Sequence, residues 1–171
     1  MGPRFRGDDK DTRSNMPTPS EGKKAPSFSL PSTTGKDLAL SDYLGKKNII
    51  LYFYPKDDTP GCTKEACDFR DSIKKFEKED AVVLGVSADS VASHQKFQKK
   101  FGLPFPLLSD ETKETIKKFG VWKEKSMYGK KYMGIERTTF LIDKEGNLRK
   151  IFSKVKVSEH CEEVLAEVKN L

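Results

Sequence analysis

The stretch Asn48-Ile-Ile-Leu-Tyr-Phe-Tyr54 decides the fold. It is a continuous apolar run, typical of a strand that is covered on both faces, and Pro55 ends it. A second apolar run, Ala81-Val-Val-Leu-Gly-Val-Ser87, follows a helical segment that ends near Glu79. The apolar residues that recur at helical spacing in that segment are Phe69, Ile73 and Phe76. This order of strand, helix and strand predicts an α/β domain.

The rest of the chain continues the alternation of strands and helices. Further expected elements are, in chain order, a short hairpin of 28–30 with 38–40 around Thr34-Gly35, a helix over 91–101, a strand over 106–108, a short helix closed by Gly120, a hairpin of 138–142 with 148–152, and a final helix around Val164. We expect a basic, glycine-containing loop from Lys123 to Glu136. The predicted fold class is α/β, with a central mixed β-sheet flanked by helices and an N-terminal β-hairpin.

Composition limits the classes of function. The chain has 171 residues, 35% of them hydrophobic, and its 32 Lys and Arg against 26 Asp and Glu give a net charge of +6. No stretch approaches 18 consecutive apolar residues and the first residues lack the apolar core of a secretory signal, so we expect neither a membrane span nor secretion. Lysines alternate with acids along helical stretches such as 71–80, as on a solvated surface, so we do not expect nucleic-acid binding.

Residues 1–20 differ from the rest of the chain. Their large apolar side chains are only Met1, Phe5 and Met16, which cannot build a core, so we expect a disordered leader. From composition alone we interpret this leader as vector-derived, with a natural start at Met16. Residues 21–171 are expected to form a single domain.

The segment most informative about chemistry runs from Pro55 to Cys67, where the buried strand leads into a helix. Open α/β sheets place their sites at the carboxyl ends of their strands. With Thr59 as N-cap, Pro60 takes the first helical position and Cys62 lies in the first turn, where free backbone N–H groups and the helix dipole favour a thiolate. Cys62 is therefore a candidate nucleophile, and the alternative is a small buried hydrophobic residue.

Cysteine number and spacing bear on compartment and metal binding. Cys62, Cys67 and Cys161 are too few and too odd in number for a disulfide-stapled secreted scaffold, and they fit reduced thiols in a cytosol. Four residues separate Cys62 from Cys67, whereas thioredoxin-type redox pairs have two, and zinc pairs need a second pair. A zinc site that recruits His160 and Cys161 is disfavoured, because these neighbours cannot readily face one metal from a helix. We expect no metal.

Several motifs in one order carry a resemblance. The pattern Pro-x-x-x-Thr-x-x-Cys, here Pro55, Thr59 and Cys62, is similar to the peroxidatic motif of peroxiredoxins. The segments that extend the match are Tyr52-Phe-Tyr-Pro-Lys, Cys62-Thr-Lys-Glu-Ala-Cys-Asp-Phe-Arg-Asp71, Leu107-Leu-Ser-Asp110, Gly120-Val-Trp122 and Arg137-Thr-Thr-Phe-Leu-Ile-Asp143. From about residue 20 to 171 the chain resembles the peroxiredoxin Q, or bacterioferritin comigratory protein, branch of atypical two-cysteine peroxiredoxins.

The resemblance implies a thioredoxin-like fold and reduction of hydroperoxides. Cys62 would be the peroxidatic nucleophile that becomes a sulfenic acid, and Cys67 the resolving cysteine that closes an intramolecular disulfide. Arg137 matches the family's active-site arginine, Pro55 would shield the thiolate from solvent, and Thr59 would hydrogen-bond the thiolate or the peroxide. An external dithiol, by resemblance thioredoxin, would reduce the disulfide. No cofactor is implied, because the sulfur itself carries the two electrons.

The other polar and aromatic residues are expected to have structural roles or to be exposed to solvent. Arg70 is a weaker candidate for a supporting contact, and Cys161 is expected to be dispensable. His94, on an apolar helical stripe, and His160, at the start of the last helix, have no obvious catalytic partner in the sequence and are expected to be structural. Trp122 is assigned to packing. The lysines assigned to a solvated rim are Lys123, Lys125, Lys130 and Lys131.

The sequence therefore predicts a thiol peroxidase that is monomeric and cytoplasmic. Two alternative functions remain open, that of a thioredoxin-like protein disulfide oxidoreductase and that of a non-enzymatic redox-responsive interaction module. Consumption of one equivalent of hydroperoxide per chain under single-turnover conditions separates the peroxidase from both.

Overall fold

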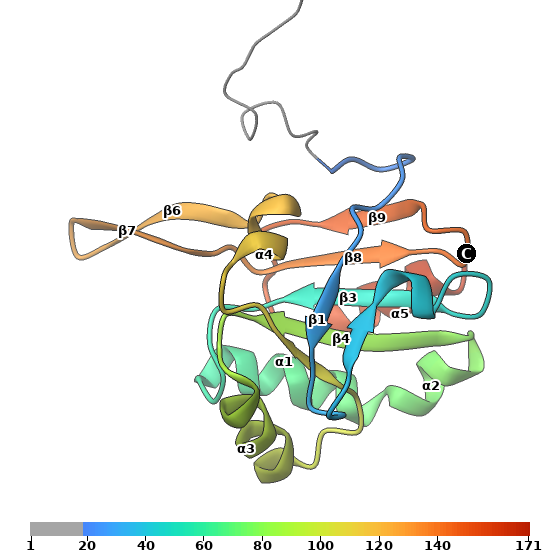
Figure 1. The fold of residues 1–171 in the computed structure, drawn as a ribbon, viewed down its shortest axis with the longest axis horizontal. Helices are drawn as coiled ribbons and strands as arrows, with labels where there is room; N and C mark the ends of the chain where they lie inside the picture. The colour runs from blue at the N-terminus through green and yellow to red at the C-terminus, as the bar shows by residue number, and fades with distance from the viewer. Residues whose placement is uncertain (1–18) are drawn as a thin grey trace, which may run out of the picture.

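A five-stranded mixed sheet forms the centre of the structure, a computed structural model that describes residues 19–171. Its strands lie in the order β5-β4-β3-β8-β9 (Figure 1), with the bounds Leu107–Ser109, Ala81–Ser87, Asn48–Phe53, Thr138–Ile142 and Leu148–Phe152. Strands β3, β4 and β5 are parallel, whereas β8 runs antiparallel to β3, and β9 antiparallel to β8. The whole of β3 is buried, as its apolar run predicts.

Two apolar cores cover the two faces of this sheet. The first lies under four helices, α1 (Pro60–Asp71), α2 (Ile73–Lys78), α3 (Val91–Phe101) and α5 (His160–Val168). The second lies under α4 (Glu114–Lys118), the hairpin of β1 (Ser29–Pro31) with β2 (Asp37–Ala39), and the 3-10 helix η3 (Leu40–Asp42). Figure 1 shows this hairpin crossing the near face of the sheet, with α5 behind it. Alternate side chains of β3 enter opposite cores, Tyr52 the first and Leu51 the second.

The prediction of a loop from Lys123 to Glu136 is wrong. The segment is a third hairpin, of β6 (Trp122–Met127) with β7 (Lys130–Ile135), which projects from the body (Figure 1). Its two-residue turn is Tyr128-Gly129, and both residues have positive φ, as the hairpin turn that fits strand twist requires. The strands are mostly exposed and, within residues 19–171, pair only with each other, so they lack the apolar alternation that marks a half-buried strand.

The helix predicted to run up to Glu79 is interrupted at Ser72. This residue has φ −108° and ψ 7°, outside the helical region, and it separates α1 from α2. Apolar residues continue at helical spacing across the break, which is why the sequence pattern does not reveal it. The other expected strands and helices lie close to their predicted bounds.

The predicted leader, residues 1–20, lies outside the described residues apart from Pro19 and Ser20, so the domain boundary at residue 20 stays a prediction. Across residues 19–171, no helix is long and apolar enough to cross a membrane.

Candidate active site

Cys62 lies in the first turn of α1, just beyond the carboxyl end of β3. Thr59 is the N-cap residue, with extended backbone, and Pro60 is the first helical residue, as predicted. Cys62 is only 1% exposed. Because the first backbone N–H groups of a helix have no partner within it, this position favours a negatively charged sulfur.

Arg137, between β7 and β8, directs its guanidinium at the Cys62 sulfur. Its Nη2 donates a hydrogen bond to Cys62 Sγ at 3.3 Å, and its Nη1 donates to Glu65 Oε1 at 2.6 Å. Gly61 leaves room for this group, since a Cβ added there would approach Nη2 to 3.1 Å. Burial acts to lower the pKa of Arg137, but the charges of Glu65 and Cys62 outweigh it and raise the pKa. The guanidinium is therefore a fixed cation against the sulfur.

Glu65, which the sequence did not single out, holds Arg137 in this orientation. Its side chain is 2% exposed, and burial raises its pKa to about 7 although Arg137 acts in the opposite direction. Glu65 Oε2 and the Tyr52 hydroxyl are buried with no hydrogen-bond partner among the described residues. A glutamate in a charged helix looks ordinary in a sequence, and its partner is 72 residues away, so no local pattern shows the pair.

The site thus combines a buried cysteine at a helix N-terminus with a guanidinium that is hydrogen-bonded to the cysteine sulfur. The comparison of this chain with known proteins is consistent with this arrangement. The AhpC/TSA family matches residues 21–151. The chain belongs to the AhpC/TSA family. Peroxiredoxin Bcp of Bacillus subtilis is 55% identical over 150 residues, which cover 88% of this chain and 95% of that relative. Peroxiredoxin Bcp of Escherichia coli K12 is 44% identical over 144 residues, which cover 84% and 92%.

Solved structures of peroxiredoxin Q proteins share this fold. PrxQ of Xylella fastidiosa has a TM-score of 0.84 and 40% identity, covering 90% of this chain and 98% of that chain. Peroxiredoxin Q of Xanthomonas campestris has a TM-score of 0.79 and 45% identity, covering 84% and 90%. The expected branch, the thioredoxin-like fold and thiol peroxidase activity are therefore confirmed. The family acts on peroxides with thiol reductants.

In this peroxiredoxin the remaining predicted site residues, Thr59, Pro55 and Cys67, lie in the chain segment that contains Cys62. The Thr59 hydroxyl donates to the Lys56 carbonyl oxygen at 2.9 Å and makes no capping hydrogen bond to the helix. Its oxygen keeps lone pairs that can accept a hydrogen bond. Pro55, which follows the end of β3, is half-buried, and so is Cys67 in the second turn of α1. All three cysteines of the chain are free thiols.

Two other residues of interest, Arg70 and Cys161, make their hydrogen bonds to groups other than the Cys62 sulfur. Arg70 lies near the far end of α1, where its Nη1 donates to the Phe101 carbonyl oxygen at 2.7 Å. Cys161 is buried in α5, where its thiol donates to the Asp68 carbonyl oxygen at 3.4 Å, and burial raises the pKa of this thiol. A raised pKa keeps a thiol protonated and unreactive, which fits the prediction that Cys161 is dispensable.

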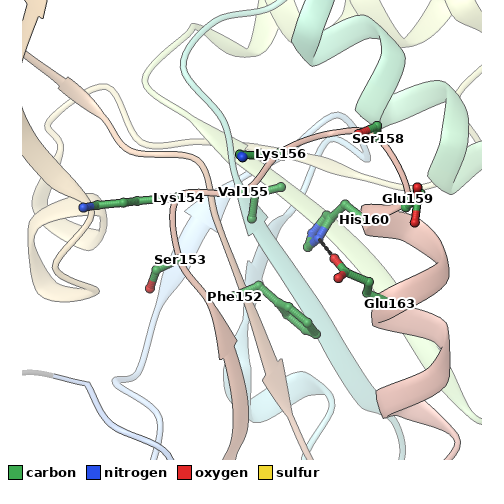
Figure 2. Close-up of a pocket in the computed structure, with 9 residues that line it drawn as sticks. All are labelled: Phe152, Ser153, Lys154, Val155, Lys156, Ser158, Glu159, His160 and Glu163. Carbon is green, nitrogen blue, oxygen red and sulfur yellow. Dashed lines mark ion pairs between the residues drawn. The ribbon is translucent and has the colours of Figure 1, made fainter.

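His160 lines a pocket between the end of β9 and α5 (Figure 2). Its Nε2 and Thr139 Oγ1 are 2.8 Å apart, and its Nδ1 lies 3.9 Å from a Glu163 oxygen. Burial, with a smaller effect of Arg137, lowers the pKa of His160 to about 4, so the ring is neutral at pH 7. Neither Cys62 nor Arg137 lines this pocket. The buried, hydrogen-bonded ring fits the structural role predicted for His160.

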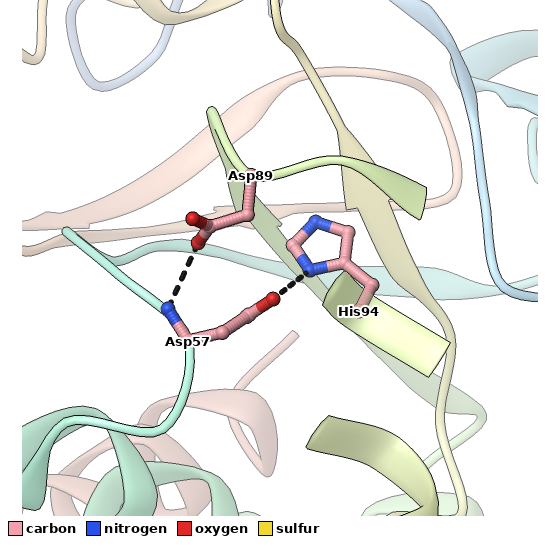
Figure 3. A group of neighbouring side chains, drawn as sticks. All are labelled: Asp57, Asp89 and His94. Atoms are coloured by element: carbon pink, nitrogen blue, oxygen red, sulfur yellow. Dashed lines mark hydrogen bonds and ion pairs between the residues drawn. The ribbon is translucent and has the colours of Figure 1, made fainter. Parts of the chain in front are cut away.

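Asp57, Asp89 and His94 form a polar cluster between the loop after β3 and α3 (Figure 3). Their potential ligand atoms lie within 4.8 Å of one another, a spacing that could hold a metal ion. Asp57 Oδ2 is 2.8 Å from His94 Nδ1 and accepts from Ser93 Oγ at 2.8 Å. Asp89 Oδ2 accepts from the Asp57 backbone N–H at 2.8 Å, and His94 Nε2 is 2.8 Å from the Leu108 carbonyl oxygen. Protein partners thus engage these groups, and we interpret the cluster as an anchor of the loop.

Trp122 packs against the second core, as predicted, and the Lys113 ammonium lies 5.5 Å from the centre of its ring. Three of the four lysines assigned to a solvated rim are exposed, namely Lys123, Lys130 and Lys131. The fourth, Lys125, is half-buried. Lys125 is therefore solvated only in part.

Proposed function

We propose that this thiol peroxidase uses the Cys62 thiolate to attack hydrogen peroxide and organic hydroperoxides. The observation that carries the proposal is the 3.3 Å hydrogen bond from Arg137 Nη2 to Cys62 Sγ in the first turn of α1. As an S–O bond forms, the O–O bond breaks, the second oxygen leaves as water or alcohol after gaining a proton, and Cys62 becomes a sulfenic acid. In support, the Xanthomonas campestris bacterioferritin comigratory protein is described by its alkyl peroxide reduction activity.

Arg137 and Thr59 bind the peroxide in this proposal. Negative charge develops on the leaving oxygen as the O–O bond breaks, and a guanidinium already fixed by Glu65 stabilises that charge without rearranging. The Thr59 oxygen, whose proton goes to the Lys56 carbonyl, accepts a hydrogen bond from the peroxide O–H. Pro55 shields the sulfur from solvent at the end of β3.

Cys67 resolves the sulfenic acid. Its thiol condenses with Cys62–SOH, releasing water and forming an intramolecular disulfide, which an external dithiol such as thioredoxin reduces by exchange. Residues five apart in an intact helix have Cα atoms roughly 8 to 9 Å apart, beyond the roughly 7 Å limit for a disulfide, so α1 has to open locally.

The proposal also covers the oligomeric state of the enzyme and its location in the cell. Because both reacting cysteines lie on one helix of one chain, a monomer suffices for the full cycle. The small and odd number of cysteines, three, fits a reducing compartment, and we propose a cytoplasmic location.

Single-turnover peroxide consumption tests these roles. Wild type should consume one equivalent rapidly and recycle with thioredoxin, Cys62→Ser should consume none, and Cys67→Ser should consume one equivalent without recycling. Cys161→Ser is the matched control and should recycle normally. Equal rates for wild type and Cys62→Ser would refute the assignment. Slow peroxide loss with rapid insulin-disulfide reduction would support the disulfide oxidoreductase, and neither activity would leave the interaction module.

A further inference from the structure

Exposed apolar side chains gather on the β6–β7 hairpin. Within residues 19–171 five large hydrophobic side chains are exposed, and four of them belong to this hairpin, namely Met127, Tyr128, Tyr132 and Met133. Tyr128, in the turn, is 96% exposed, and the fifth residue, Leu44, lies elsewhere, between η3 and β3. Single exposed apolar residues are ordinary on a protein surface, but a group of them on one element indicates an interaction surface.

The same hairpin is basic. Between residues 122 and 135, four lysines against one acidic residue, Glu124, give a net charge of +3. No carboxylate within residues 19–171 forms an ion pair with any of these lysines. Two of them, Lys130 and Lys131, directly follow the turn, so positive charge lies beside the exposed apolar side chains.

The strand register places these side chains on both faces of the hairpin. Residues that pair directly across a hairpin project from the same face, and successive residues of a strand project from opposite faces. Met127 and Tyr132 therefore project from one face, and Met133 from the other. Lys130 shares the face of Met127, with which it pairs, and Lys131 shares the face of Met133. Apolar and basic groups thus surround the outer part of the hairpin.

The shape of the hairpin favours a fluid surface over a rigid one. It stands away from the body of the protein (Figure 1), and within residues 19–171 its strands pair only with each other. A rigid protein partner of standard size contacts roughly 800 Å² in one patch, and on a two-stranded ribbon such a patch lies on one face. A lipid surface can enclose the ribbon on all sides. Apolar side chains on both faces and at the turn therefore fit a lipid surface better.

The spacing of the apolar residues matches the depth of an interfacial contact. Met133 lies three residues beyond Lys130, the first residue of β7, or roughly 10 Å at the rise of a β-strand. Amphipathic segments in a membrane interface bury their apolar side chains by about 5–10 Å. In this arrangement Tyr128 enters first, and Tyr132 stays at the level of the head groups, where tyrosine is enriched. The flexible stems of the lysines let their ammonium groups stay at the lipid phosphates.

A second copy of this chain is a poorer occupant of the hairpin. Two hairpins in contact bring lysines of like charge together, and lysines on exposed strands oppose pairing from edge to edge. With a net charge of +6 on each chain, electrostatic repulsion opposes self-association, whereas the same charge attracts the chain to an anionic membrane surface.

We propose that the β6–β7 hairpin docks this enzyme on anionic lipid surfaces, with the turn at Tyr128 inserted between head groups and the lysines bound to lipid phosphates. This binding does not depend on the role of Cys62. Each lysine near an anionic membrane contributes about fivefold in affinity. Arg137 follows the last residue of β7 by two positions, so the peroxide site lies at the base of the hairpin, roughly one strand length of 20 Å from the lipid.

Vesicle flotation with the reduced full chain tests the charged part of this proposal. At about 0.1 M salt, wild type should bind vesicles of equal parts phosphatidylglycerol and phosphatidylcholine at least about tenfold more tightly than vesicles of phosphatidylcholine alone. Lys130→Gln combined with Lys131→Gln should weaken this binding about 30-fold. The matched control, Lys74→Gln with Lys75→Gln, removes the same charge from two adjacent exposed positions of α2, on the opposite side of the molecule (Figure 1), and should bind within about threefold of wild type.

Two variants of the turn test the apolar part. Tyr128→Ser should weaken binding to the anionic vesicles at least about fivefold, because it removes apolar surface that enters the lipid. Leu44→Ser, at an exposed apolar position outside the hairpin, should bind as wild type. The fluorescence of Tyr128→Trp should shift to the blue on these vesicles by more than that of Trp122 in wild type, and Leu44→Trp should show no such shift.

The remaining outcomes assign the hairpin to another occupant. All variants should consume hydrogen peroxide at the wild-type rate, which shows that their fold is intact. Absence of binding to the anionic vesicles, or an equal loss in the α2 control, would overturn the proposal. A dimer that Tyr128→Ser dissociates, in place of vesicle binding, would identify a second copy as the occupant. A raised KM for thioredoxin in Tyr128→Ser, again without vesicle binding, would identify a protein partner, and either result overturns lipid docking.

Discussion

Asp57 and Glu65 are both buried carboxylates, eight positions apart, and they differ in how fully their oxygens are hydrogen-bonded. Both oxygens of Asp57 are engaged, since Oδ1 accepts from the Tyr54 hydroxyl at 2.6 Å and Oδ2 lies 2.8 Å from His94 Nδ1. Among the residues that the structure describes, only one oxygen of Glu65 accepts a hydrogen bond, from Arg137. Burial acts to raise the pKa of Asp57, but its hydrogen bonds outweigh it and lower the pKa, whereas burial raises the pKa of Glu65 to about 7.

We infer from this difference that the site has a fixed part and a part that can open. The satisfied network around Asp57 ties the loop after β3 to α3, and such networks are rigid. In the first turns of α1, Arg137 donates hydrogen bonds to Cys62 and Glu65, and a buried oxygen without a partner, as Glu65 Oε2 is among the described residues, costs about 1–3 kcal/mol of stability. We infer that α1 opens for disulfide formation while the loop before it stays anchored.

The largest effect on stability should come from removing the anchor. Asp57→Ala should lower the free energy of unfolding by about 3–5 kcal/mol, because Tyr54 and His94 lose a buried acceptor. Urea unfolding measures the change. The control is Asp58→Asn, which removes an exposed ion pair with Lys100 and should cost less than about 1 kcal/mol. Equal losses in the two variants would mean that the network does not anchor the loop.

Of the residues bound to these two carboxylates, Arg137, the partner of Glu65, should have the largest effect on catalysis. Arg137→Gln should slow peroxide reduction by at least about 100-fold, even at a pH where Cys62 is fully ionised, because it removes a donor to the developing charge. Stopped-flow rates, compared at equal thiolate ionisation, test this. Arg70→Gln, at the far end of α1, should react at the wild-type rate. If Arg137→Gln matches wild type at equal ionisation, the arginine acts only by favouring the thiolate.

A smaller effect concerns pH. The folded pKa of Glu65 exceeds its ordinary value of 4.5, so the folded state holds a proton that the unfolded state has lost. Glu65 therefore contributes stability below about pH 4.5 that disappears as the pH rises through about 7. Asp57 acts in the opposite sense, since its lowered pKa contributes stability that is lost as the pH falls below its ordinary value of 3.8.

Glu65→Gln tests this sign. Between pH 5 and 8 wild type should lose roughly 1–3 kcal/mol of unfolding free energy that Glu65→Gln keeps, measured by urea unfolding at each pH. The same pH dependence in both proteins would show that Glu65 titrates alike in the folded and unfolded states.

The smallest effect should appear in amide exchange. Oxidation to the Cys62–Cys67 disulfide should speed exchange at least about tenfold over residues 59–69, because α1 opens there, and should leave α3 unchanged. Unchanged protection in α1, or equal loss in α3, would contradict a division between an opening helix and a fixed anchor.

Strongly apolar elements were predictable from the sequence, and polar long-range contacts were not. The buried run of β3 and the placement of Thr59, Pro60 and Cys62 at a helix start follow from local patterns. The β6–β7 hairpin was missed because its exposed strands carry no apolar period, although the Tyr128-Gly129 turn was a usable signal.

Within the site, the sequence indicated the candidate nucleophile Cys62 but not its surroundings. The importance of Arg137 came from the family resemblance, since an arginine before a strand carries no local signal. Glu65 looked like an ordinary charge, because its partner Arg137 lies 72 residues away. The partner of His94 is Asp57, 37 residues earlier, which no helical pattern indicates.

The most direct test of the central claim is to locate the sulfenic acid. Cys67→Ser, which lacks the resolving thiol, is treated with one equivalent of hydrogen peroxide in the presence of a dimedone-type reagent, and the labelled peptide is identified by mass spectrometry. The account predicts one label per chain, on Cys62, and an at least about 100-fold slower appearance of that label when Arg137→Gln is added. A label on Cys161, or on Cys62 at the same rate in both proteins, would contradict it.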